Sequence, residues 1–276
     1  MRLRLLSLLK KLGIGVLSLV AGLYLLAMGL LYWQQENILF FPRPADPALA
    51  SQVGAELVEV ENQGVTLRGW FVKASRAEAD TIVFYGGNGD EMSRSLAAIT
   101  ALGDYNYLLM NYRGYGASEG RPGEAGLKAD AVAILETLQG RGRMDIRRSH
   151  LIGRSLGSGI AVHVAARLEV ASLVLVTPYD SISAVAAGRY PVFPIGLLIK
   201  HPFDSLADVG RIEEPTLIIK AASDRVVPHV HSDALIAAWQ SPLQTLTLAG
   251  TTHNSIYSPA FYAQIGAFID QAGAGP

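Results

Sequence analysis

Apolar and polar positions divide the chain into one long apolar stretch near its start and a longer mixed region behind it. No charged residue occurs from Leu12 to Trp33, a run of 22 residues. A helix of that length rises about 33 Å, enough to cross a hydrocarbon core of about 30 Å. The basic flank 1–11 precedes the run, and Tyr32 and Trp33 close it where interfacial aromatics gather. The pattern predicts a transmembrane signal anchor over 12–33.

A cleaved signal peptide is the alternative for this segment. Its apolar core is usually about 7–15 residues long and precedes a small-residue cleavage site, whereas this run is longer and no clear Ala-x-Ala site follows it. We therefore expect an uncleaved anchor. Because basic flanks stay in the cytoplasm, we expect the rest of the chain on the far side, in a periplasmic or other extracytoplasmic space. Under the alternative, a soluble exported form would begin near residue 30.

The mixed region has the pattern of an α/β protein. Residues 34–52 are expected to form a linker, because the steps into Pro42 and Pro44 disfavour helix. Residues 53–273 then fit one domain in which short apolar runs alternate with helical periodicities. The runs predict strands at Glu56–Val60, Leu67–Val72, Thr81–Tyr85, Tyr107–Asn111, His150–Ile152, Leu173–Val176, Thr216–Lys220 and Thr245–Leu248. The periodicities predict helices near Met92–Leu102, Leu127–Leu138, Leu156–Leu168, Ser232–Trp239 and Phe261–Gln271.

Strands that alternate with helices predict a mainly parallel eight-stranded sheet flanked by helices. The first two strands alternate in polarity and are expected to form an antiparallel edge, whereas the later ones are continuous apolar runs typical of burial on both faces. Residues 181–203 interrupt this rhythm because they are apolar and contain several prolines. We interpret them as a small lid over a pocket, with an ordinary core connection as the alternative.

Composition excludes several classes of function. The net charge is −1 and no basic cluster occurs beyond the N-terminal flank, which argues against nucleic-acid binding. The sequence contains neither a Walker loop nor a complete dinucleotide-binding glycine pattern, and no His/Glu cluster has metal-ligand spacing. We therefore predict no cofactor and no metal.

One short motif indicates nucleophilic catalysis. Gly153, Ser155 and Gly157 form Gly-x-Ser-x-Gly between a predicted strand and a predicted helix. A sharp strand-to-helix turn lifts its central side chain clear of the sheet and requires small neighbours. The same turn directs the N–H of Leu156 at the space above Ser155, where an oxyanion would develop. The motif alone is common in a chain with 28 glycines, so its context decides its meaning.

A serine nucleophile needs a base and an acid, which in this type of sheet follow it in the order acid, then histidine. Asp224 follows the Thr216–Lys220 strand and His253 follows the last strand, so we predict these two as partners of Ser155. Asp180, after Leu173–Val176, remains the alternative acid. The other histidines are less suitable as the base. His150 begins a predicted strand, His163 lies inside a predicted helix, and His201 lies in the predicted lid. His229 and His231 lie at a predicted helix start, where they would face solvent or cap the helix.

A second oxyanion donor is expected from the loop after the third strand. That loop reads Tyr85-Gly86-Gly87-Asn88-Gly89, and its glycines allow backbone N–H groups to turn toward one point. We predict the Gly87 N–H as this donor, together with that of Leu156. A plain glycine turn is the alternative.

These residues and their neighbours resemble the α/β-hydrolase superfamily, and within it the Bem46-like, membrane-anchored branch. The similarity covers most of the chain. It rests on the glycine loop after Tyr85, on Asn111-Tyr112-Arg113-Gly114-Tyr115-Gly116-Ala117-Ser118-Glu119-Gly120, on Gly153–Gly159, on Asp224-Arg225-Val226-Val227-Pro228, on His253-Asn254, and on the anchor followed by Ile38-Leu39-Phe40-Phe41-Pro42. Two positions depart from that branch: Tyr85 replaces its usual His, and Gly87 replaces Asn.

The resemblance implies a membrane-anchored serine hydrolase with a Ser155-His253-Asp224 triad and an acyl-enzyme intermediate. An apolar lid beside a bilayer suggests small acyl esters, thioesters or lipids as substrates. A peptidase-type hydrolase and a non-catalytic binding module on the same fold are the alternatives. For Arg113 we favour a structural role, with hydrogen bonds to backbone carbonyls, over a role at the acyl site.

Overall fold

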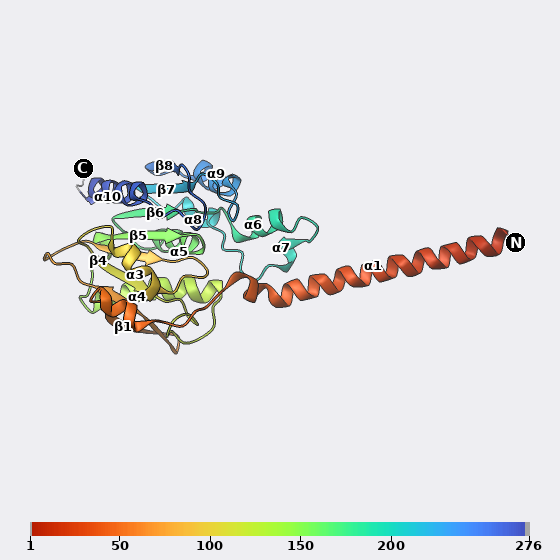
Figure 1. Cartoon of the computed structure of the whole chain (residues 1–276), viewed down its shortest axis with the longest axis horizontal. Helices are drawn as coiled ribbons and strands as arrows, with labels where there is room; N and C mark the ends of the chain where they lie inside the picture. The colour runs from red at the N-terminus through yellow and green to blue at the C-terminus, as the bar shows by residue number, and fades with distance from the viewer. Residues whose placement is uncertain (1, 274–276) are drawn as a thin grey trace.

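An eight-stranded sheet forms the centre of the protein, with strand order β1-β2-β4-β3-β5-β6-β7-β8 (Figure 1). The computed structural model describes residues 2–273. The strands are β1 (Glu56–Asn62), β2 (Val65–Val72), β3 (Thr81–Tyr85), β4 (Asn106–Met110), β5 (Ser149–Arg154), β6 (Ser172–Val176), β7 (Thr216–Ala221) and β8 (Leu243–Leu248). All eight lie at the predicted places, and β3 has the predicted bounds.

The helices connect these strands in the predicted alternation. They are α1 (Arg2–Leu39), α2 (Pro47–Gln52), α3 (Met92–Thr100), α4 (Glu124–Gly140), the short 3-10 helix η1 (Ile146–Arg148), α5 (Leu156–Ala165), α6 (Ile182–Arg189), α7 (Ile195–Leu198), α8 (Leu206–Val209), α9 (His229–Ala238) and α10 (Pro259–Gly273).

The sheet is parallel except at one edge. β1 pairs antiparallel with β2, and β2 pairs antiparallel with β4, whereas β4, β3, β5, β6, β7 and β8 run parallel to their neighbours. The predicted antiparallel edge is therefore confirmed. β5 lies in the interior of the parallel part and is buried along its whole length. Its carboxyl end, where Ser155 follows, opens at the same edge of the sheet as the ends of β3, β7 and β8.

Two apolar layers hold helices on both faces of the sheet. Because successive side chains of a strand point to opposite faces, Leu151 belongs to the layer that holds α4, α5 and α9, whereas Ile152 belongs to the layer that holds α3 and α10. The central strands are buried on both faces for this reason, and they appear in the sequence as continuous apolar runs.

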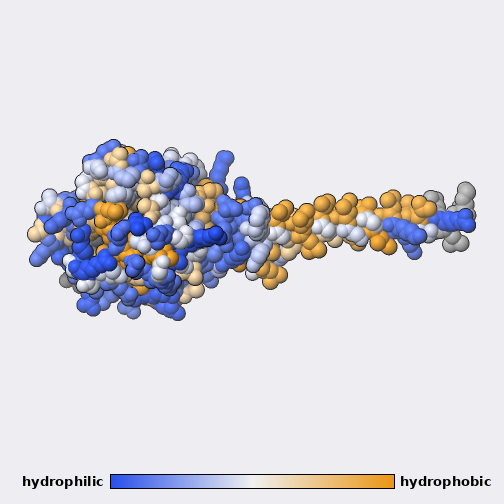
Figure 2. Space-filling model, turned by 90° about the horizontal axis from the view of Figure 1, so that it is seen from below, coloured by the Kyte–Doolittle hydropathy of each residue, from blue (hydrophilic) through white to orange (hydrophobic). Residues whose placement is uncertain are grey.

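The N-terminal helix is longer than the apolar run that predicted it. α1 continues past Trp33 to Leu39, and it extends away from the rest of the protein (Figure 1). Apolar side chains cover most of it, with hydrophilic ones near its start (Figure 2). The segment 34–52 differs from the expected extended linker, because it contains the end of α1 and also α2. Asp46 accepts the N–H of Ala48 and caps α2.

Residues 181–203 lie between the sheet and α1 and include α6 and α7 (Figure 1). We call this segment the lid. It begins after β6, where Ser181 caps α6 by accepting the N–H of Ala184. It ends before α8. Ile182 and Val185 of α6 are half-buried against the core, whereas Val192 and Leu197 further along the segment are exposed.

Candidate active site

Ser155 occupies a strained turn between β5 and α5. Its backbone has φ 50° and ψ −119°, in the left-handed region that residues with a Cβ rarely adopt. The turn brings α5 close to β3, so that a Cβ on Gly157 would lie 2.1 Å from the Tyr85 carbonyl oxygen. Glycine is therefore required at 157, and the close approach holds Ser155 at the carboxyl end of β5. Such strain is typical of functional turns.

The structure brings the predicted base and acid to this serine. His253 lies in the loop after β8, and its Nε2 is 2.9 Å from Ser155 Oγ. Asp224 lies in the loop after β7, and its Oδ2 is 2.7 Å from His253 Nδ1. Ser155, His253 and Asp224 thus form one hydrogen-bonded chain across three strand ends. This arrangement can remove a proton from the serine hydroxyl.

Asp224 is held in its charged form. Its side chain is 2% exposed, and burial alone would raise the pKa of this carboxyl. The hydrogen bond with His253 and the N–H groups of Val227 and Val226 outweigh burial, and the pKa of Asp224 is lowered. An ionised carboxylate here fixes the Nδ1–H tautomer of His253 and leaves Nε2 to accept a proton from Ser155.

Asp180, the alternative acid, lies apart from this chain. Its Oδ1 is 3.0 Å from His231 Nδ1, so it pairs with a different histidine. His231 is buried, which corrects the expectation that it faces solvent or caps α9. The contact joins positions 51 residues apart, so no local pattern could have indicated it.

Arg154 and Asp90 connect the glycine loop to the histidine loop, and sequence reasoning missed both. Asp90 Oδ2 accepts the Gly87 N–H at 2.7 Å and lies 2.9 Å from Arg154 Nη1. Arg154 Nη2 donates to Asn254 Oδ1 at 3.1 Å and to the His253 carbonyl at 3.3 Å. The available signal was a charged residue, Arg154, inside an otherwise apolar buried turn.

The segment that follows β4 holds the glycine loop through two tyrosine hydroxyl groups. The Tyr112 hydroxyl donates to the Gly86 carbonyl at 2.8 Å, and the Tyr115 hydroxyl donates to the Asn88 carbonyl at 2.7 Å. Arg113 instead forms a two-pronged ion pair with Asp130, with both N–O distances 2.6 Å. Arg113 therefore has a structural contact, as expected, but its partner is the Asp130 carboxylate and not the backbone carbonyls that we expected.

The end of α1 touches the same glycine loop. Asn88 Nδ2 donates to the Leu39 carbonyl at 2.9 Å, and the Phe41 N–H donates to the Asn88 carbonyl at 3.0 Å. The loop beside Ser155 is therefore bonded directly to the chain that leaves the apolar helix.

A cavity of about 670 Å³ opens beside Ser155. Its walls come from the end of α1, from the lid and from the loop after Asp224, and most of them are apolar. Representative lining residues are Leu31, Ile38, Leu156, Val185, Ile195, Leu198 and Val230. The space suits an extended apolar group bound next to the serine hydroxyl.

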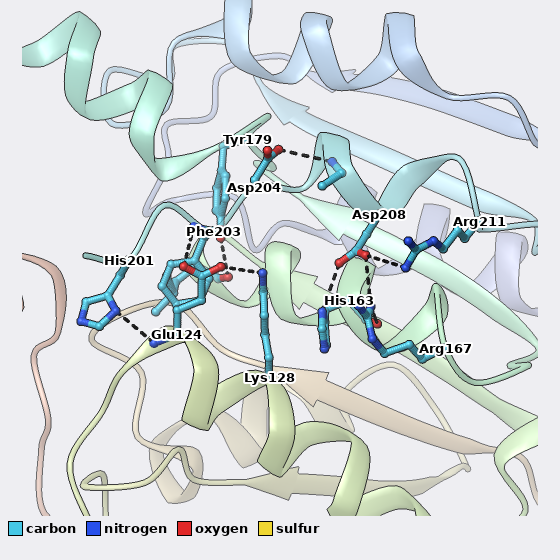
Figure 3. A network of polar contacts seen from close by, with 12 residues as sticks. Glu124, Lys128, His163, Arg167, Tyr179, His201, Phe203, Asp204, Asp208 and Arg211 are labelled. Atoms are coloured by element: carbon cyan, nitrogen blue, oxygen red, sulfur yellow. Dashed lines mark hydrogen bonds and ion pairs between the residues drawn. The ribbon is translucent and has the colours of Figure 1, made fainter. Parts of the chain in front are cut away.

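His150 and His163 pair with residues outside the triad, whereas His201 lines the cavity beside Ser155. His150 opens β5, with Nδ1 2.8 Å from Ser172 Oγ, and burial lowers its pKa. His163, in α5, pairs with Asp208 at 3.1 Å (Figure 3). Within residues 2–273, no group of three or more His, Asp or Glu side chains is placed to hold a metal ion.

Comparisons with known proteins agree with this fold. Residues 81–194 match the family profile described as the alpha/beta hydrolase fold. An uncharacterized protein of Mycobacterium tuberculosis is 34% identical over 247 residues, which cover 86% of this chain and 88% of that protein. The alpha/beta hydrolase domain-containing protein WAV2 of Arabidopsis thaliana is 26% identical over 243 residues, covering 78% of this chain and 79% of that protein.

Solved structures share the fold. An esterase of Pyrococcus furiosus superposes with a TM-score of 0.67 at 17% identity, covering 85% of this chain and 98% of the esterase chain. At that identity the likeness concerns the arrangement of the sheet and helices.

Proposed function

This chain belongs to the α/β-hydrolase superfamily, and from that premise we propose that it is a membrane-anchored serine hydrolase of carboxylic esters or thioesters. The observation that carries the proposal is the hydrogen-bonded chain from Ser155 Oγ through His253 to Asp224, placed on a strained turn beside an apolar cavity. Each member follows a different strand in the parallel part of the sheet, so the three meet only in the folded protein.

In the proposed reaction, His253 Nε2 takes the Ser155 proton while Ser155 Oγ attacks the substrate carbonyl carbon. The carbonyl electron pair moves to oxygen and forms a tetrahedral oxyanion. Its collapse breaks the bond to the leaving alkoxide or thiolate, which receives the proton from His253. Water then attacks the acyl-enzyme, with His253 as base, and releases the acid and Ser155. Asp224 stabilises the His253 imidazolium during both acylation and deacylation.

Two N–H groups are proposed to bind the oxyanion. Leu156 is the first residue of α5, where an N–H has no acceptor within the helix. Gly87 is the second candidate, because a Cβ at that position would lie 3.6 Å from Ser155 Cβ. Its N–H is bonded to Asp90 Oδ2, so an oxyanion would compete with this carboxylate for the Gly87 donor. Removing one such donor in another serine hydrolase costs about 10²–10³ in rate.

We assign the substrate class from the cavity and the anchor. Apolar walls beside Ser155 suit the acyl part of an ester, thioester or lipid, and α1 has the length and composition of a membrane span. The basic flank is proposed to lie in the cytoplasm and the catalytic domain on the far side. The anchor and the motifs after β3, β4 and β5 favour the Bem46-like branch of the superfamily.

A fluorophosphonate probe tests the catalytic proposal on the full chain in detergent. Wild type is expected to become labelled, and Ser155→Ala to remain unlabelled while it melts as wild type does. Ser95→Ala, at a serine of α3 outside the triad, is the matched control and should label normally. A folded wild-type protein that resists the probe would favour a non-catalytic binding module on this fold.

A further inference from the structure

The lid is joined to α1 along a seam that begins deep in the apolar part of the helix. Tyr24 stacks on Phe193, with ring centroids 5.5 Å apart and planes 7° from parallel. The Tyr24 hydroxyl donates to the Val192 carbonyl at 2.7 Å. The hydrogen bond joins positions separated by 168 residues in sequence. They place the loop between α6 and α7 against the side of the predicted membrane span.

The seam continues toward the catalytic domain. Gln35 Nε2 donates to the Leu198 carbonyl at 3.0 Å, and Gln35 Oε1 accepts the Lys200 N–H at 2.7 Å. The Lys200 ammonium lies 4.6 Å from the centre of the Tyr32 ring. Polar side chains of α1 thus satisfy backbone groups of the lid. The deeper bond, from the Tyr24 hydroxyl to the Val192 carbonyl, supplies a partner where hydrocarbon offers no water.

The position of Tyr24 along α1 sets the depth of this contact. Tyr24 precedes Trp33 by nine residues, which is about 13 Å of helix. With Tyr32 and Trp33 at the membrane interface, Phe193 lies well inside the hydrocarbon, whose full thickness is about 30 Å. Lys200 then lies at the interface beside Tyr32, where its ammonium reaches water.

The composition of the lid fits that placement. Its tip, residues 190–199, contains no charged residue and is bracketed by Arg189 and Lys200. Val192 is 70% exposed and Leu197 is 85% exposed. In water these side chains would form an unfavourable apolar surface next to the apolar α1. In a bilayer both surfaces face lipid.

The base of the lid is fixed to the domain. Glu124 Oε2, at the start of α4, accepts the Phe203 N–H at 2.9 Å, and Lys128 lies 2.6 Å from Glu124 Oε1 (Figure 3). His201 Nδ1 accepts the Glu124 N–H at 3.3 Å (Figure 3). With its base held on α4 and its tip held on α1, the lid has a defined orientation.

The cavity beside Ser155 reaches this seam. Leu31 and Ile38 of α1, and Ile195 and Leu198 of the lid, line the same hollow as Ser155. We propose that the lid tip is a second membrane element, inserted beside α1 in the leaflet that faces the domain, and that the seam admits the acyl chain of a bilayer-resident ester or thioester to Ser155. This inference rests on the proposed membrane anchoring.

Depth-dependent quenching tests the insertion without relying on hydrolysis. The chain has no cysteine, so Leu19→Cys, Leu197→Cys and Glu136→Cys each provide one site for an environment-sensitive fluorophore. The labelled full-length proteins are placed in phosphatidylcholine vesicles with or without doxyl groups on the acyl chains. We expect doxyl lipid to quench the labels at 19 in α1 and at 197 in the lid, and not the label at the exposed position 136 of α4.

The label at position 19 distinguishes the proposed membrane anchor from the proposed insertion of the lid. Quenching at 19 with none at 197 would overturn the lid insertion and leave the anchor intact. The absence of quenching at 19 would overturn the anchor itself, and with it this inference. Neither result depends on Ser155 being catalytic.

Hydrolysis then tests the route of the acyl chain. Leu197→Asp should lower turnover of a long-chain ester embedded in vesicles by about tenfold, because a carboxylate resists entry into hydrocarbon. Turnover of a short water-soluble ester should not change. Leu57→Asp, an equally apolar exposed position on β1, is the control and should affect neither. Equal loss on both substrates with Leu197→Asp would contradict the route.

A second pair of variants tests the seam itself. Leu31→Trp narrows the cavity, because Leu31 lines it, whereas Leu30→Trp changes the neighbouring exposed position on α1. We expect only Leu31→Trp to shift chain-length preference toward shorter acyl groups. The same preference in both variants would contradict entry along the seam.

Discussion

Arg154 Nη1 lies 2.9 Å from Asp90 Oδ2, the same oxygen that accepts the Gly87 N–H. The other end of the guanidinium binds the His253 carbonyl and Asn254 Oδ1. One buried side chain therefore links the two loops that must keep a fixed separation during the proposed reaction. We interpret Arg154 as a positioning residue, because its contacts are to the loops and not to the serine hydroxyl.

Arg154→Met should lower kcat with little change in KM. Loss of the link lets the Gly87 and His253 loops shift, and a displacement of about 1 Å in an active site can cost about 10²-fold in rate. The kcat of Arg154→Lys should lie between those of Arg154→Met and wild type, because a single ammonium group cannot bind both loops as the two ends of a guanidinium do. Steady-state kinetics with a soluble ester measures the effect. Arg94→Met, at an exposed position of α3, is the control. A rise in KM at constant kcat for Arg154→Met would contradict the assignment.

Asp224→Asn should remove most activity while the fold is retained. The amide oxygen can still accept the N–H groups of Val226 and Val227, which bind Asp224 Oδ1. The new NH₂ group faces His253 Nδ1 and imposes the wrong tautomer, a change that costs about 10⁴ in kcat in another Ser-His-Asp enzyme.

Asp180→Asn is the matched variant for this test. It alters the pair with His231 and leaves the chain through His253 unchanged. Activity near that of wild type is expected. A loss as large as that of Asp224→Asn would indicate that the acid assignment is wrong.

Tyr85→Phe should stabilise the protein or leave it unchanged. The Tyr85 hydroxyl is buried and has no hydrogen-bond partner within the described residues, and burial raises its pKa. An unpaired buried hydroxyl costs about 1–3 kcal/mol, so its removal should raise the free energy of unfolding by about 1 kcal/mol. Chemical denaturation in detergent measures this quantity. A large destabilisation would show that the hydroxyl binds an ordered water or another group.

Stability should fall as the solution becomes acidic. Burial lowers the pKa of His150, with Asp80 opposing the shift, so the folded protein keeps this imidazole neutral. The unfolded chain takes up a proton as pH falls through about 6.5. Between this value and the lower folded pKa, the unfolded state binds more protons, so the free energy of unfolding decreases as pH falls.

Thermal melting between pH 8 and pH 5, about 1.5 units either side of the ordinary histidine value, measures this effect. His150→Asn, whose amide can still reach Ser172 Oγ, should have a shallower dependence. Part of the slope should persist, because burial and Arg167 also lower the pKa of His163. A mutant slope equal to that of wild type would contradict a contribution from His150.

Local patterns were sufficient to predict the strands and helices of the sheet. Thr81–Tyr85 was predicted with its observed bounds because burial on both faces leaves a continuous apolar run. The elbow at Ser155 was also readable, since a sharp turn requires small residues at fixed spacing. The end of α1 was misjudged, because residues after Trp33 are polar enough to end the apolar run yet continue the helix to Leu39.

Pairings between distant side chains required the tertiary structure. The order of strands placed Asp224 and His253 near Ser155 in prediction, because parallel strands carry their loops to one edge. No such rule pairs Asp180 with His231, or Arg154 with Asp90, since each contact depends on how an irregular loop that carries the aspartate packs on a strand or helix. The sequence by itself thus determined an α/β sheet, an apolar N-terminal helix and a set of candidate residues. Only the folded chain decided that the lid packs on α1 through Tyr24 and Gln35, because contacts over more than 160 residues arise from packing and leave no periodic signal.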